Sequence, residues 1–193
     1  MIKKFLLGMT FACFTFGIAH ATTYGSERFN SEYNQTKIYD CNWADHGHIR
    51  YYIHQLERYG IQTVVYPYQL RIVIPNSVFF IPLTNVVVYT AQDPFYILAA
   101  LLETLPGVKI KIIGYSDNVA LQQVNLKESL DHAQKLSAYL WMNNIPNETQ
   151  DLKYQGDGEN SPIANNISVD GMAKNRRVEV WVTIPHAKGP MLG

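Results

Sequence analysis

Five side chains in the second half of the chain could recognise a charged ligand. They are one carboxylate, one imidazole, two guanidinium groups and one carboxamide, which belong to Asp117, His132, Arg176, Arg177 and Asn125. Carboxylates accept hydrogen bonds from cations, and guanidinium groups donate them to anions. Four of these groups also have a structural interpretation, because Asp117 can cap a turn, His132 can be a surface helix residue, and the two arginines can fix the last strand against a loop. The set therefore favours non-covalent binding, with internal contacts as the alternative.

Patterns typical of enzymes are absent from the sequence. It contains no G-x-S-x-G motif, no phosphate-binding loop and no catalytic pairing of cysteine with histidine. His46 and His48 are two residues apart and His54 follows six later, so on a helix the three would not share one face. We predict no enzymatic activity, no metal site and no cofactor.

The N-terminus has the pattern of a signal peptide. Lys3 and Lys4 precede an apolar stretch, and residues 19–21 match the small-x-small cleavage pattern. We expect cleavage after Ala21 and a periplasmic mature chain. Lipidation at Cys13 and retention as an uncleaved anchor are the alternatives.

The charge balance argues against nucleic acid as a partner. The chain has 16 basic and 16 acidic residues, and removal of Lys3 and Lys4 leaves an acidic surplus of two. No segment after the signal peptide approaches the ~18 apolar residues of a transmembrane helix. The remaining cysteine, Cys41, is expected to be buried or paired with another chain.

The spacing of apolar residues predicts helices that alternate with strands. The predicted helices span 44–59, 93–105 and 125–142, and the predicted strands span 61–66, 70–74, 108–112, 152–155 and 178–184. Pro75 and Asn76 are expected to break the second strand, with 78–81 as a short apolar continuation. Asp45 and Asp93 are the expected N-caps of the first two helices. The long helix is expected to bury Leu126, Leu130, Ala133, Leu136 and Leu140. This order favours an α+β fold in which helices pack on one face of a mixed sheet.

Four motifs give the region from about 72 to 184 a likeness to a known family. They are Gly114-Tyr-Ser-Asp117, residues 125–133, residues 156–166 and Asn175-Arg-Arg-Val-Glu179, which fall in this order on a strand, a helix, a loop and a strand. The region resembles the OmpA-like, peptidoglycan-associating domain of bacterial envelope proteins. The resemblance implies a βαβαβ sandwich. It also suggests a division into a signal peptide (1–21), an extended arm (22–43), a helix–strand preface (44–68), the OmpA-like domain (69–185) and a tail (186–193).

The resemblance also implies a ligand and the residues that hold it. Asp117 would contact the ammonium group of a diaminopimelate stem peptide, and an arginine of the helix motif would contact a carboxylate. His132 stands at that arginine position, and Glu128 stands where leucine is usual. An imidazole is mostly neutral near pH 7 and lacks the paired donors of arginine, so the loss is roughly 1.5–3 kcal/mol. We expect weak or lost affinity for peptidoglycan, with Asn125, Arg176 and Arg177 as further contacts if binding is retained.

The preface narrows the resemblance further. A helix ending at Gly60, followed by strands near 61–66 and 70–75, is similar to the OmpA-like component of Dot/Icm type IVB secretion systems. This implies a structural part in an outer-membrane-associated assembly, with other subunits of an envelope secretion complex as partners and peptidoglycan as an additional one. The alternative is a peptidoglycan-anchoring protein that binds the stem peptide.

Overall fold

The computed structural model describes residues 37–38, 47–82 and 84–185. The expected signal peptide, most of the arm, Cys41, Asp45, His46 and the tail lie outside the described residues. No helix in the described part of the chain is long and apolar enough to cross a membrane.

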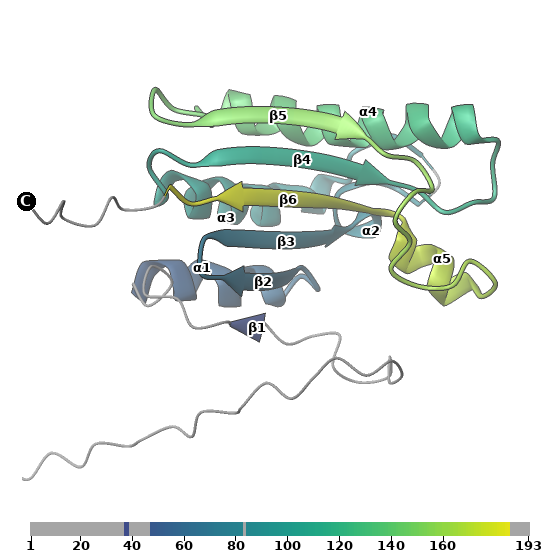
Figure 1. Ribbon diagram of the computed structural model, residues 1–193, viewed down its shortest axis with the longest axis horizontal. Helices are drawn as coiled ribbons and strands as arrows, with labels where there is room; N and C mark the ends of the chain where they lie inside the picture. The colour runs from purple at the N-terminus through teal and green to yellow at the C-terminus, as the bar shows by residue number, and fades with distance from the viewer. Residues whose placement is uncertain (1–36, 39–46, 83, 186–193) are drawn as a thin grey trace, which may run out of the picture.

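One layer of the fold is a six-stranded mixed sheet (Figure 1). In chain order its strands are β1 (Lys37–Ile38), β2 (Gln62–Tyr66), β3 (Gln69–Pro75), β4 (Lys109–Tyr115), β5 (Asp151–Gly156) and β6 (Arg177–Thr183). In space the order is β1-β2-β3-β6-β4-β5, so the C-terminal strand lies in the middle of the sheet. The β1–β2 and β4–β5 pairs are parallel, and the other pairs are antiparallel. The predicted division at residue 68 remains a prediction, although β2 pairs with β3 along its whole length.

The helices pack mainly on one face of this sheet, as Figure 1 shows for α1, α3 and α4. The helical segments are α1 (Gly47–Glu57), α2 (Asn76–Phe79), the short 3₁₀ turn η3 (Tyr89–Ala91), α3 (Gln92–Glu103), α4 (Gln122–Met142) and α5 (Val169–Asn175). Alternate residues of the central strand, Val178, Val180 and Val182, are fully buried beneath them. The predicted α+β class, with a mixed sheet and helices on one face, is confirmed.

The prediction for the buried face of the long helix is correct only in its second half. Leu126 and Leu130 are 39% and 41% exposed, whereas the polar residues Asn125, Ser129 and His132 are buried. The reason is the close approach of the helix to the sheet: a Cβ atom on Gly114 would lie 1.9 Å from the carbonyl oxygen of Ser129. Only small or internally hydrogen-bonded side chains fit at this contact, so two leucines turn outward.

Two local predictions were wrong. The chain after β3 does not continue as a strand: residues 76–79 form α2, and the amide of Phe80 bonds the carbonyl of Asn76. Asp93 is not the N-cap of α3, because the 3₁₀ turn η3 leads directly into the helix and places Ala91 at the cap. The carboxylate of Asp93 instead accepts a hydrogen bond of 3.5 Å from the Tyr59 hydroxyl, which links α3 to the end of α1.

Candidate functional site

A cavity of about 230 Å³ lies between the N-terminal half of α4, the segment around α2 and the chain just after α5. Its polar and charged lining includes Asn76, Thr84, Glu128, His132 and Arg176. Glu128 and His132 are four residues apart, so they lie one above the other on the same side of the helix. The tertiary structure therefore brings together two predicted site residues, His132 and Arg176, with Glu128 beside them.

The ring of His132 is held inside the protein rather than offered to a ligand. Only 2% of the residue is exposed, and its ring stacks on Phe80 with the centroids 4.2 Å apart. The Asn76 side-chain amide donates to Nδ1 at 3.0 Å, so Nδ1 carries no proton. The hydrogen is then on Nε2, which donates to the carbonyl oxygen of Thr84 at 3.3 Å. These two bonds define a neutral imidazole.

Burial also opposes protonation of this imidazole. The loss of solvent around His132 lowers its pKa below the ordinary value, and this outweighs the opposite effects of the Thr84 carbonyl and of the Glu128 and Asp131 carboxylates. A neutral ring at this position supplies no positive charge to the cavity. The interpretation of His132 as a surface helix residue is therefore wrong, and its position as a charged anion contact is unsupported.

We expect the His132 ring to stay neutral to a lower pH than a free imidazole. An NMR titration of the ring protons, with a short unstructured histidine peptide as the reference, measures this directly. The lowered pKa also determines how stability depends on pH. Between a pH of about 6.5 and the lower folded-state pKa, His132 binds a proton in the unfolded chain but not in the folded chain. Stability should therefore fall as the pH drops through this interval. Titration of His132 at or above the pH of the reference peptide would contradict the neutral assignment.

Asp117 is occupied by contacts within the protein. Its Oδ2 accepts a hydrogen bond of 2.5 Å from Nη1 of Arg176, and its Oδ1 accepts one of 3.0 Å from the backbone amide of Val119. The residue is 7% exposed and is not among those that line the cavity. Asp117 thus caps the turn after β4, as the structural interpretation predicted. It also pairs with Arg176, the predicted cationic residue that lines the cavity.

The other two predicted site residues hold the framework. Asn125 is 1% exposed and donates to the Ala120 carbonyl at 3.0 Å and to the Glu159 carboxylate at 2.8 Å, which joins the start of α4 to the loop after β5. Arg177 is 2% exposed and bonds Glu179 at 2.6 Å. Neither side chain lines the cavity.

Sequence reasoning missed three residues that shape the site. Asn76 and Thr84 fix the tautomer of His132, and Phe80 stacks on its ring. They lie about 50 residues before the helix motif, in a segment whose pattern gave only an apolar stretch and a strand break. Within the described residues, no group of three or more histidine, cysteine or acidic side chains could hold a metal ion.

The fold and the site together define a class of protein. It is a two-layer α+β domain with a cavity at the strand ends, beside the longest helix. Residues 88–176 match the model of the OmpA family. This match spans 89 of the 193 residues, so it shows a similarity to that family over this part of the chain.

Comparison with curated proteins supports this assignment over part of the chain. The chain is 27% identical over 109 residues to "Probable lipoprotein YiaD" of Escherichia coli, an alignment that covers 56% of this chain and 49% of the relative. It is 33% identical over 81 residues to "Peptidoglycan-binding protein ArfA" of Mycobacterium tuberculosis, covering 42% of this chain and 24% of the relative. The chain thus spans about half of the first relative and a quarter of the second.

Solved structures share the fold. The cell wall anchor of the T6SS from Pseudomonas aeruginosa superposes with a TM-score of 0.60 at 21% identity, covering 71% of this chain and 97% of that chain. A periplasmic domain of Helicobacter pylori MotB superposes with a TM-score of 0.56 at 19% identity, covering 63% and 80%. At these low sequence identities, the structural similarity shows that the fold is shared.

Proposed function

We propose that this chain is a non-enzymatic envelope protein of the periplasm. In this proposal it is a structural component of an outer-membrane-associated assembly, and its OmpA-like domain places it at the cell wall with weak or lost affinity for peptidoglycan. The assembly we favour is a type IVB secretion system, in which the chain would correspond to the OmpA-like component DotK (IcmN). The helix–strand preface, which is α1, β2 and the start of β3, carries this narrower assignment.

The observation that carries the proposal is the state of the expected ligand pair. A diaminopimelate stem peptide presents both charge signs, so a pocket that holds it needs a free acid and a free base. Here Asp117 already pairs with Arg176, and His132 is neutral, buried and hydrogen bonded on both ring nitrogens. A ligand would have to displace these contacts before it gained its own, and the cost of that exchange lowers its affinity.

The comparisons support a location at the cell wall. One relative is named as a peptidoglycan-binding protein, another as a probable lipoprotein, and one structural neighbour as a cell wall anchor. A second candidate function, direct anchoring through the stem peptide, has one observation in its favour. Glu128 and Arg176 line the same cavity and carry opposite charges, so a zwitterionic ligand could still find both signs.

Co-sedimentation of the purified domain with cell wall sacculi distinguishes the two candidates. We expect little protein in the pellet, and we expect Asp117→Ala to change that fraction little, because Asp117 is internally paired. The variant His132→Arg restores a guanidinium at this position and should raise binding about 10- to 100-fold, provided that circular dichroism shows it folded.

Tight sedimentation of the wild-type chain that Asp117→Ala abolishes would refute weak affinity and favour direct anchoring. A folded His132→Arg variant that binds no better would show that position 132 is not the limiting contact. The structural role has a separate test, since the tagged full chain should co-purify with an envelope complex from its native cell. Recovery of the chain alone would count against it.

A further inference from the structure

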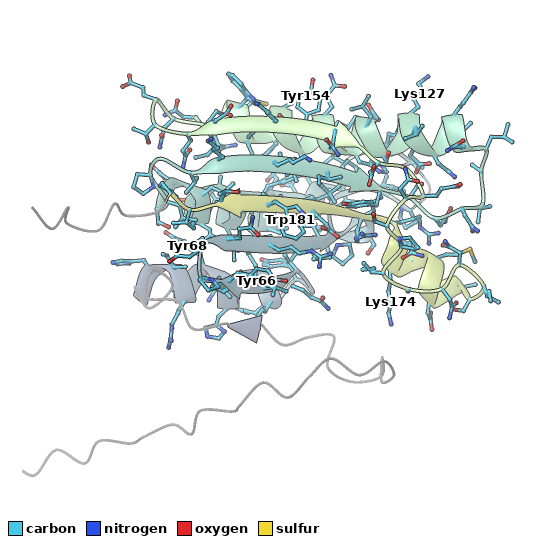
Figure 2. The ribbon with its side chains drawn as sticks, viewed as in Figure 1. Tyr66, Tyr68, Lys127, Tyr154, Lys174 and Trp181 are labelled. Carbon is cyan, nitrogen blue, oxygen red and sulfur yellow. The ribbon has the colours of Figure 1, made fainter. Side chains whose placement is uncertain are left out.

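The face of the sheet opposite the helices carries two lysine side chains, Lys111 and Lys153, that take no part in a buried ion pair. No helix in the described part of the chain covers this face, and Trp181 lies near its centre (Figures 1 and 2). The register of four strands places Arg71, Trp181, Lys111 and Lys153 directly beside one another. We call these four residues the basic row. They alternate along their strands with core residues, so their side chains share the uncovered face.

Acidic side chains on this face pair with Arg71 but leave the two lysines of the basic row without a close, buried counter-charge. Glu179 lies next to it, but its two oxygens accept from Arg71, Arg177 and Trp181 and only 1% of the residue is exposed. Lys111 is exposed and has no ionic or hydrogen-bond partner for its side chain among the described residues. Lys153 is 79% exposed, and its nearest acid, Asp151, is 3.8 Å away and itself 55% exposed. Solvent therefore meets two lysines and a partly exposed, paired arginine around one indole ring.

The stability of the sheet does not explain this pattern. Like charges directly opposite each other on neighbouring strands destabilise a sheet, and Lys111 and Lys153 are such a pair. A lysine on an edge strand protects against unwanted strand pairing, which accounts for Lys153 on β5. It does not account for Lys111, because β4 lies between β6 and β5. The repulsion between Lys111 and Lys153 therefore lowers the stability of the sheet, and binding of an oppositely charged partner would offset this loss.

We propose that the basic row docks an acidic segment of a partner protein. The lysines complement acidic side chains in charge. Trp181 and Arg71, with the guanidinium 5.1 Å from the indole centroid, are of the residue types that anchor protein interfaces. A second copy of this chain is a poor occupant, because face-to-face pairing would bring two basic rows together. The inference rests on the proposed structural role in an assembly and names the surface that would carry it.

The first test is a titration of the purified chain with poly-L-glutamate, the simplest acidic polypeptide. We expect binding that weakens as salt increases and that falls about tenfold in Lys111→Glu/Lys153→Glu. This variant keeps a like-charge pair across the same two strands, so its melting temperature should match that of the wild type. The control is Lys127→Glu/Lys174→Glu, which reverses two charges on α4 and α5, away from Trp181 (Figure 2). Equal losses in both variants would overturn the proposal.

The second test identifies the occupant in the native cell. A photo-crosslinking residue replaces Gln155, which lies two residues beyond Lys153 on the same face of β5. We expect an adduct whose sequenced peptide is rich in aspartate and glutamate, and we expect Lys111→Glu/Lys153→Glu to lose it while the control variant keeps it. An adduct to peptidoglycan, to a second copy or to a non-acidic segment would overturn the proposal. Co-purification with an envelope complex despite that result would leave the proposed function standing.

Discussion

Replacement of Glu179 by glutamine should lower the free energy of unfolding by about 3 kcal/mol, measured by urea denaturation at neutral pH. The carboxylate lies at 2.5 Å and 2.6 Å from nitrogens of Arg71 and Arg177, and it also accepts from the Trp181 indole. Removal of one partner from a buried ionic network costs about 3–5 kcal/mol, because the remaining charge stays buried without compensation. We expect the lower end, because the Arg71 side chain is 23% exposed.

The matched control is Asp151→Asn. It makes the same carboxylate-to-amide change on the same face of the sheet, but its partner Lys153 is 3.8 Å away and both side chains are mostly exposed. Surface pairs of this kind contribute about 0–1 kcal/mol, so this variant should stay close to the wild type. Equal effects of the two substitutions would show that the buried network does not stabilise the fold.

The effect of Glu179→Gln should also depend on pH. Burial alone would raise the pKa of Glu179, but the hydrogen bonds and charges of Arg71 and Arg177 outweigh it and hold the pKa below its ordinary value of 4.5. A lowered pKa adds stability above the unfolded-state pKa, and this stability disappears as the pH falls through the folded-state pKa. The difference in stability between wild type and variant should therefore be constant near neutrality and shrink below a pH of about 4.5.

Substitution of Gly114 by alanine should be among the most damaging small changes in the domain. The added Cβ would lie 1.9 Å from the carbonyl oxygen and 2.7 Å from the carbonyl carbon of Ser129, both of which are backbone atoms of α4. Neither can rotate away, so the helix must separate from the sheet. Overpacking of this kind costs about 1–3 kcal/mol and sometimes more. We expect at least the upper value, which is a fall in melting temperature of roughly 10 °C or a chain that does not fold.

Gly47→Ala is the control for this substitution. No atom lies within 4 Å of the position that its Cβ would take at the start of α1. Alanine there should leave the melting temperature unchanged or raise it slightly, because alanine loses less backbone entropy than glycine on folding. A Gly114→Ala variant as stable as Gly47→Ala would refute the close helix–sheet contact. Failure of Gly114→Ala to accumulate as soluble protein, when Gly47→Ala accumulates normally, would support it.

Most of the framework could be predicted from the sequence, because it depends on local patterns. The alternation of apolar and polar residues predicted the strand that became β6, and Gly60 marked the end of the first helix, where its φ angle is +73°. The Gly114, Asn125 and Asn175 motifs predicted the order of strand, helix, loop and strand. These signals arise within a few residues of chain, so no tertiary contact is needed to recognise them.

The state of the site could not be predicted in this way. The sequence placed an imidazole at position 132, but it could not show that Asn76, Phe80 and Thr84, about 50 residues earlier, would enclose that ring and fix its tautomer. Nor could it show that Asp117 would pair with Arg176, 59 residues later. Periodicity also predicted that Leu126 and Leu130 are buried. In the structure they are exposed, because glycines of β4 and β5 bring the sheet too close to α4 for leucine side chains to fit between them.

The sequence by itself determined the α+β class, the element order and the position, His132, at which the expected ligand pair departs from the family that the chain resembles. Only the tertiary structure decided that this residue is neutral and buried, that Asp117 is paired, and that Arg71, Trp181, Lys111 and Lys153 stand side by side on the open face of the sheet. The physical reason is the range of the interactions. Helix and strand patterns are set by neighbours in the chain, whereas charge, protonation and solvent exposure depend on groups that only folding brings together.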